Sequence, residues 1–164
     1  MTDTLTIALA QANPTVGDLA GNLARIRAQR AEAAKAGADL VVFPELALTG
    51  YPPKDLLLQE GFVQGVMAEA DVIGRASTGV TVVFGAPLAA DEGGRVNTHR
   101  LTNSLLAYRD GVRVARYDKR LLPTYDVFDE NRYFFPGERA VVITVGGVKV
   151  GLSICEDLWR GEDV

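Results

Sequence analysis

Cysteine and histidine are nearly missing from this sequence of 164 residues, which holds one of each, Cys155 and His99. A single cysteine excludes a disulfide within the chain, so nothing calls for an oxidising compartment and we expect a cytoplasmic protein. Zinc sites usually need several cysteines or histidines, so we expect no metal site. His99 lies in a polar segment and is interpreted as an exposed turn residue. If Cys155 acts as a nucleophile, another side chain must serve as its base.

The sequence also lacks clusters of positive charge and long apolar runs. Its 17 lysines and arginines are outnumbered by 21 aspartates and glutamates, which gives a formal net charge of -4. Binding of nucleic acid or of an anionic membrane needs clustered lysine and arginine, so neither partner is expected. No apolar stretch is long enough to span a bilayer, and residues 1–4 lack the order of a secretory signal. A glycine-rich phosphate loop and a dinucleotide-binding fingerprint are missing as well.

Apolar runs of strand length alternate with helical stripes along the chain, and 48% of the residues are hydrophobic, which suits one globular domain. Two helices are expected, with Asp18 and Asp55 as their caps. Asp-Gly at 110–111 and Gly-Gly at 146–147 predict two β-hairpins. The expected strands are 5–11, 39–43, 80–84, 103–108, 112–117, 141–145 and 148–154.

Three of these strands carry more specific expectations. Strand 5–11 is predicted to be buried, and the continuous apolar run 39–43 is predicted to be a central strand covered on both faces. Strand 80–84 is expected to be closed by the segment Gly85-Ala86-Pro87, because glycine and proline are typical of turns.

Three chemically reactive side chains each follow a predicted strand: Glu45, Lys119 and Cys155. Considered singly, each has an ordinary explanation. A glutamate or a lysine after a strand is usually an exposed loop residue, and a lone cysteine on an apolar strand is usually an inert core residue.

Together, the three side chains predict a hydrolase. A thiol with an ordinary pKa of about 8.5 is mostly protonated at neutral pH, and Glu45 could accept its proton. When the thiol attacks an amide carbonyl, Lys119 and a backbone N–H near Cys155 could stabilise the oxyanion. The segment Tyr51-Pro52-Pro53 is expected to be extended, because prolines restrict the backbone, and to form a pocket wall beside Glu45.

Three segments resemble the signatures of the nitrilase (carbon-nitrogen hydrolase) superfamily and occur in that family's order. Within the superfamily, the loops 48–53, 122–130 and 155–159 resemble the glutaminase domain of glutamine-dependent NAD synthetases. This similarity spans nearly the whole chain, and it favours a catalytic cysteine over an inert one. The three signature segments are Val42-Phe43-Pro44-Glu45, Lys119-Arg120-Leu121-Leu122-Pro123 and Gly151-Leu152-Ser153-Ile154-Cys155-Glu156-Asp157.

The resemblance implies a triad that hydrolyses the side-chain amide of L-glutamine without a metal or an organic cofactor. Glu45 would act as a base and then as an acid toward ammonia. Cys155 would carry a γ-glutamyl thioester, and Lys119 would stabilise the tetrahedral intermediates.

The resemblance also implies roles for four residues outside the triad. Tyr51 and Tyr125 would line the glutamine pocket, and Glu156 would lie close to the substrate. Glu130 is expected to assist Lys119.

The fold implied by the resemblance is an α/β sandwich of the nitrilase-like α-β-β-α type with mixed β-sheets, which often packs against a second subunit, so a homo-oligomer is expected. Members of the family continue well past the nucleophile. We therefore expect residues 1–164 to be the N-terminal part of a carbon-nitrogen hydrolase (glutamine amidohydrolase) domain with an incomplete sandwich. A C-terminal synthetase domain, which would use ATP and magnesium to amidate nicotinic acid adenine dinucleotide, would be absent.

Two other interpretations remain open from the sequence. The first is a stand-alone amidase or nitrilase of the same superfamily that acts on another amide. The second is a non-catalytic scaffold, which the three reactive side chains at strand ends disfavour because packing does not need them.

Overall fold

The centre of the protein is a five-stranded mixed sheet in the computed structural model, which describes residues 4–90 and 100–159. The strands lie in the order β1-β2-β3-β4-β5. The first three are parallel, and β4 and β5 are each antiparallel to the strand before. This arrangement confirms the predicted α/β class with a mixed sheet. The strands are β1 (Ile7–Leu9), β2 (Leu40–Val42), β3 (Thr81–Ala89), β4 (Leu101–Arg109) and β5 (Val112–Asp118).

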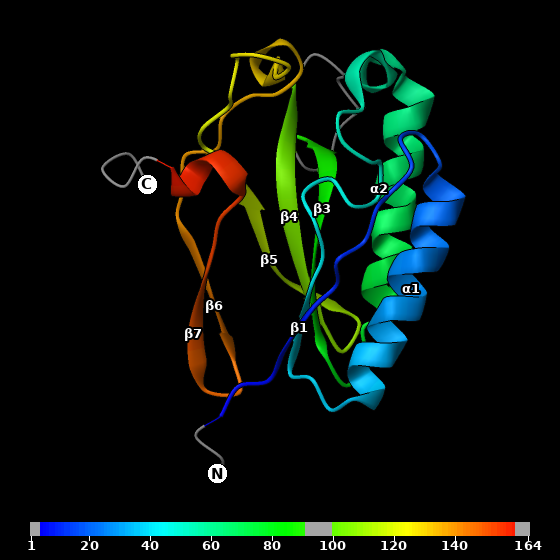
Figure 1. Ribbon diagram of the computed structural model, residues 1–164, viewed down its shortest axis with the longest axis vertical. Helices are drawn as coiled ribbons and strands as arrows, with labels where there is room; N and C mark the ends of the chain where they lie inside the picture. Colours follow the sequence, from blue (N-terminus) through cyan, green and yellow to red (C-terminus); the bar gives the residue numbers. More distant parts are fainter. Residues whose placement is uncertain (1–3, 91–99, 160–164) are drawn as a thin grey trace.

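Two helices, α1 (Leu19–Lys35) and α2 (Glu60–Arg75), lie side by side and cover one face of this sheet (Figure 1). The carboxylate of Asp18 accepts a hydrogen bond of 2.9 Å from the N–H of Gly21, which confirms Asp18 as the cap of α1. The prediction for Asp55 was wrong. Asp55 lies inside a short 3-10 helix, η1 (Lys54–Leu58), and Gln59 occupies the N-cap of α2 without a side-chain hydrogen bond.

The hairpin of β6 (Val141–Val145) and β7 (Val148–Leu152) packs on the opposite face of the sheet (Figure 1). Ile143 and Val145 from this hairpin join a buried cluster with Tyr117 of β5. The layers are therefore helices, five-stranded sheet and two-stranded sheet. A second helical layer does not occur within residues 4–90 and 100–159, so the described part is the incomplete sandwich that was expected.

Strand β2 has the predicted position at the centre of the packing. Leu40 is 2% exposed and packs toward the hairpin, whereas Val41 is 1% exposed and packs toward the helices. Strand β1 differs from the prediction of a buried strand, because it borders only β2 in the described sheet. Leu9 of this edge strand is 72% exposed.

Strand β3 is longer than predicted, because Gly85 and Pro87 lie within it rather than ending it. Strand β2 borders β3 only as far as Val83, so the later half of β3 has a strand neighbour on one side only. A proline is tolerated there because its missing N–H leaves no ladder bond unmade on the open side.

Two other predictions concern loops. Residues 51–53 are not extended throughout: the Tyr51-Pro52 bond is cis, and Pro53 has helical backbone angles at the start of η1. His99, which was predicted to be an exposed turn residue, lies outside the described residues. In the part of the chain that is described, no helix is both long and apolar enough to span a membrane.

Candidate active site

The carboxyl ends of β2, β5 and β7 lie at the same end of the molecule (Figure 1). The pairing explains this for β2 and β5, because β5 is antiparallel to β4, β4 is antiparallel to β3, and β3 is parallel to β2. Glu45, Lys119 and Cys155 each follow one of these ends. The fold thus brings three segments that are far apart in sequence to one region.

The position of Glu45 depends on a close approach between its loop and β3. A Cβ atom added to Gly85 would lie 2.3 Å from the backbone N of Leu46 and 3.1 Å from the Cα of Glu45. Only glycine leaves room for this contact. The N–H of Leu48 donates a hydrogen bond of 3.3 Å to the carbonyl of Gly85, which ties the same loop to the strand.

Lys119 is wholly buried, in contrast to the ordinary solvated lysine that a strand exit alone would indicate. Its Nζ donates to Oε1 of Glu45 at 2.7 Å and to Oε1 of Glu130 at 2.9 Å. Burial acts to lower the pKa of Lys119, but the charges and hydrogen bonds of the two glutamates outweigh it and raise that pKa. The ammonium therefore stays charged inside the protein.

Glu130 lies in the short 3-10 helix η2 (Glu130–Arg132) and is 4% exposed. Burial raises its pKa most, and the charge of Glu45 raises it further, while the hydrogen bonds from Lys119 and Tyr51 act in the opposite direction. The Tyr51 hydroxyl donates to Oε1 of Glu130 at 2.8 Å. Tyr51 is thus close to the predicted assisting glutamate, and its hydroxyl is engaged within the protein.

Cys155 begins the 3-10 helix η3 (Cys155–Leu158), three residues after the end of β7, rather than directly at a strand end as predicted. Its φ of 43° is in the left-handed region, and its side chain is exposed. Partial burial raises the pKa of the thiol, and the charge of Glu45 raises it further. Lys119 and the backbone N–H of Glu156 act to lower it. Cys155 therefore lies within electrostatic reach of Glu45 and Lys119.

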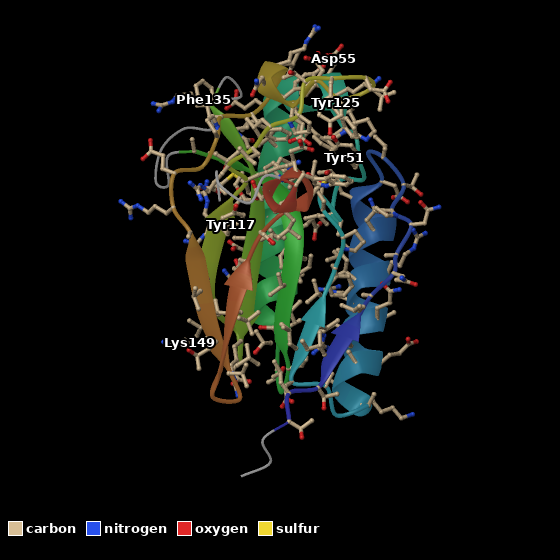
Figure 2. The ribbon with its side chains drawn as sticks, turned by 60° about the vertical axis from the view of Figure 1, so that its left-hand side comes forward. Tyr51, Asp55, Tyr117, Tyr125, Phe135 and Lys149 are labelled. Atoms are coloured by element: carbon tan, nitrogen blue, oxygen red, sulfur yellow. The ribbon has the colours of Figure 1, made fainter. Side chains whose placement is uncertain are left out.

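Tyr125 is in contact with Glu156, the residue that directly follows Cys155. The Tyr125 hydroxyl donates to Oε2 of Glu156 at 2.9 Å, and Tyr125 is 56% exposed. Both residues line a cleft of about 280 Å³ together with residues of the 120–124 segment. Figure 2 shows Tyr51 and Tyr125 in the upper half of the molecule, far from Lys149 on the β6–β7 hairpin.

Sequence reasoning missed two residues of the site. Asn103 in β4 is fully buried and donates from Nδ2 to Oε1 of Glu45 at 2.7 Å. The backbone carbonyl of Asn103 accepts a hydrogen bond of 2.8 Å from the backbone N–H of Lys119. Asp157, which lies in the third signature segment, is 1% exposed and accepts hydrogen bonds from the 117–121 stretch and from the N–H of Ile154. No signal in the sequence distinguished Asn103, which begins the predicted strand 103–108 and lies between Thr102 and Ser104.

Within residues 4–90 and 100–159, no group of three or more histidine, cysteine, aspartate or glutamate side chains is arranged to hold a metal ion.

Comparison with known families identifies the group to which the chain belongs. The model of the carbon-nitrogen hydrolase family matches residues 6–164. The chain is a member of the carbon-nitrogen hydrolase family. The matched region includes the three signature segments around Glu45, Lys119 and Cys155.

Individual carbon-nitrogen hydrolases resemble the chain over most of its length. It is 41% identical over 158 residues to the glutamine-dependent NAD(+) synthetase of Synechocystis sp., a match that covers 96% of the chain and 28% of that relative. The structure of glutamine-dependent NAD+ synthetase from Acinetobacter baumannii superimposes with a TM-score of 0.88 at 34% identity, over 97% of the chain and 29% of that protein. The chain thus spans under a third of the length of these two relatives.

A solved structure of an amidase is also similar to the chain. An amidase from Nesterenkonia sp. gives a TM-score of 0.80 at 27% identity, over 97% of the chain and 60% of that protein. In that structure, acrylamide has undergone Michael addition at the active-site cysteine.

Proposed function

We propose that this chain forms part of the glutaminase of a glutamine-dependent NAD synthetase. In this proposal it hydrolyses the side-chain amide of L-glutamine, with Cys155 as nucleophile, Glu45 as base and acid, and Lys119 as the fixed positive charge. The observation that supports it most is the buried Lys119 ammonium, bonded at 2.7 Å to Glu45 and at 2.9 Å to Glu130. Burying a lysine and two carboxylates has a desolvation cost that apolar side chains would avoid, so packing alone does not explain the arrangement. A fixed positive charge suits a site in which negative charge develops during the reaction.

The first half of the reaction forms a thioester. The Cys155 thiol gives its proton to Glu45 while its sulfur attacks the side-chain carbonyl carbon of glutamine. The carbonyl oxygen becomes an oxyanion, which Lys119 and the N–H of Glu156 stabilise. The carbon–nitrogen bond then breaks, the proton held by Glu45 passes to the leaving nitrogen, and ammonia departs.

The second half returns the free enzyme. Glu45 takes a proton from a water molecule, which attacks the thioester carbonyl. The carbon–sulfur bond breaks, glutamate leaves, and the thiol regains a proton. The raised pKa of Cys155 agrees with this scheme, because a thiol that is protonated at rest needs a base at the moment of attack.

The pocket residues have less direct support. Tyr125 and Glu156, which directly follows Cys155, line the same cleft and are suited to binding the polar α-amino acid end of glutamine. Tyr51 would act mainly by holding Glu130, because its hydroxyl is bonded to that residue. Glu130 would in turn assist Lys119.

The remaining expectations concern the whole protein. The ammonia would serve the amidation of nicotinic acid adenine dinucleotide to NAD, with ATP and magnesium, in a C-terminal synthetase domain. The synthetase names of the two relatives support this part of the proposal. A cytoplasmic location, self-association and the lack of a cofactor for glutamine hydrolysis stay predictions.

One alternative has a specific observation in its favour. The similarity to the Nesterenkonia amidase leaves open a stand-alone amidase that acts on another amide. The site would use the same triad, and the two proposals differ in substrate.

The test uses the full-length protein and a glutamine-analogue diazo-ketone. We expect mass spectrometry to find the label on Cys155 and we expect Glu45→Gln to abolish NAD synthesis from glutamine while synthesis from free ammonia continues. Label at another residue would refute the nucleophile. Hydrolysis of simple amides but not of glutamine would support the amidase instead.

A further inference from the structure

The carboxylate of Asp157 lies beneath the turn that presents Cys155. Its Oδ2 atom accepts a hydrogen bond of 3.0 Å from the N–H of Ile154 and one of 2.5 Å from the hydroxyl of Tyr117 in β5. Ile154 directly precedes the nucleophile, and Asp157 is 1% exposed. One oxygen of this buried carboxylate therefore fixes the chain on the N-terminal side of the thiol to the central sheet.

The other oxygen of Asp157 binds the segment that carries the ammonium. Its Oδ1 accepts the N–H of Arg120 at 3.1 Å and the N–H of Leu121 at 2.9 Å. Arg120 directly follows Lys119. A single side chain is thus bonded to the residue before Cys155 and to the residue after Lys119, although 37 positions separate Asp157 from Arg120.

We propose that Asp157 is a positioning residue, which holds the Cys155 thiol and the Lys119 ammonium at a fixed separation. The inference rests on the proposed function, because it concerns how the attacking sulfur and the stabilising charge stay aligned. Asp157 acts through its neighbours and does not touch the substrate. Misplacement of a reacting group by about 1 Å can reduce a rate about 100-fold, so such a clamp has a large effect on turnover.

The chemistry of the four partners explains why an aspartate is needed. All four groups approach it as donors, and an ionised carboxylate only accepts. An asparagine has the same shape but offers an acceptor on one side and an NH₂ group on the other. Either orientation sets the NH₂ group against a backbone N–H, on the side of Cys155 or on the side of Lys119, and releases one of the two segments.

Asp157 also helps to hold Cys155 in its left-handed backbone conformation. With its φ of 43°, Cys155 is in the left-handed region, which residues other than glycine rarely adopt. The bond from Ile154 to Asp157 closes the turn across this residue. Loss of that bond would let the backbone relax and move the sulfur.

The test compares Asp157→Asn with Asp129→Asn in the full-length protein. Asp129 is a matched control, because it is an aspartate on a nearby loop with its side chain 61% exposed. For Asp157→Asn we expect a fall of about 100-fold in kcat for glutamine, with KM within about threefold of the wild type. The concentration of active sites is measured by titration with the diazo-ketone, and kcat is calculated per titrated site, so that unfolded protein is not counted as enzyme. Asp129→Asn should retain the wild-type values.

A second readout does not depend on the substrate. The rate at which iodoacetamide alkylates Cys155 is followed against pH in both variants. In Asp157→Asn the thiol loses its alignment with Lys119, and we expect its titration to move to higher pH. The control should retain the wild-type profile. If the wild type does not hydrolyse glutamine, the proposed function fails, and this measurement still decides the inference.

A third variant covers the case in which Asp157→Asn does not fold. Tyr117→Phe removes one donor to Asp157 and leaves the carboxylate in place. We expect a fall of about tenfold in kcat and a smaller shift of the alkylation profile in the same direction. Unchanged kcat per titrated site together with an unchanged alkylation profile, in Asp157→Asn or, failing that, in Tyr117→Phe, would overturn the proposal.

Discussion

The Nζ atom of Lys119 lies 2.7 Å from Oε1 of Glu45, although 74 residues separate the two along the chain. The side chain of Lys119 is 0% exposed, whereas that of Glu45 is 19% exposed. The pair therefore has a buried end at Lys119 and a partly exposed end at Glu45. Asn103 binds the same Oε1 atom, so in the proposed mechanism the proton goes to Oε2, the second carboxylate oxygen of Glu45.

Replacement of Lys119 by glutamine should harm both stability and activity. The change leaves Glu45 and Glu130 near each other without the ammonium, and breaking a buried ion pair from one side costs about 3–5 kcal/mol in the free energy of unfolding. Loss of the charge that we propose to stabilise the oxyanion should reduce glutamine hydrolysis about 100- to 1,000-fold. Urea unfolding and steady-state kinetics measure the two effects.

Arg132→Gln is the matched control for that variant. Arg132 and Asp129 form an exposed pair at 3.9 Å, with both side chains 61% exposed. Exposed pairs contribute about 0–1 kcal/mol, so stability should hardly change. Equal losses in the two variants would contradict the special position of Lys119.

The titration of Cys155 should respond to its two charged neighbours in opposite directions. The pKa of the thiol is raised, so alkylation by iodoacetamide should increase with pH through a midpoint above that of an ordinary thiol. Glu45 raises this pKa, and therefore Glu45→Gln should move the midpoint down. Lys119 lowers it, and Lys119→Gln should move the midpoint up. Shifts of the same sign in both variants would show that Cys155 does not lie between these charges.

Substitution of Gly85 should displace the proposed base without changing any reactive group. In Gly85→Ala the new methyl group would lie 2.3 Å from the backbone of Leu46, so the loop that carries Glu45 must move. We expect a fall of about 100-fold in kcat for glutamine. Gly61→Ala is the control, because a Cβ there meets nothing within 4 Å and α2 should gain about 0.5–1 kcal/mol. Retained activity in Gly85→Ala would mean that the position of the loop does not matter.

The stability of the fold should fall at alkaline pH. Burial and the hydrogen bond to Asp157 raise the pKa of Tyr117. The pKa of Lys119 is raised as well, because its two glutamates outweigh its burial. In both groups the folded state holds the proton more tightly than the unfolded chain does. Their contribution is therefore complete below the ordinary pKa values of about 10 and is lost as the pH rises through the folded values.

Thermal unfolding followed at increasing pH measures this effect. The melting temperature should begin to fall near pH 10, at about the ordinary tyrosine and lysine pKa values. The fall should be shallower in Tyr117→Phe, which removes one of the two titrating groups. A melting temperature that rises over this range would contradict the assignment.

Removal of the Tyr125 hydroxyl tests the proposed substrate cleft. Tyr125→Phe deletes the bond of 2.9 Å to Glu156 and leaves the triad untouched. One hydrogen bond is worth about 1 kcal/mol, so KM for glutamine should rise about fivefold with little change in kcat. A fall in kcat at constant KM would instead connect Tyr125 to the chemical step.

The sequence predicts the triad because each of its members follows an apolar strand, and the pairing of β2, β3, β4 and β5 then brings two of these strand ends together. The supporting contacts could not be predicted in the same way. Tyr51 and Glu130 lie 79 residues apart, and their hydrogen bond depends on how two loops fold over the strand ends. Asn103 faces Glu45 only because β4 pairs with β3 in one register.

The errors in the secondary structure have a similar origin. Gly85 and Pro87 are typical turn residues, and the sequence does not show that β2 ends early enough to leave that part of β3 open on one side. Asp55 was predicted to cap α2 because aspartate is a common capping residue. In the structure, Asp55 lies inside the 3-10 helix η1, which precedes α2.

The left-handed backbone conformation of Cys155 lowers the stability of the fold at the position that carries the thiol. A residue with φ of 43° is under tension unless it is glycine, and the surrounding hydrogen bonds supply what holds it there. Glycine at this site would relieve the tension and remove the sulfur, which would yield a sturdier protein that cannot attack an amide. The folded protein is therefore less stable than it could be, because it holds an exposed cysteine in a strained conformation.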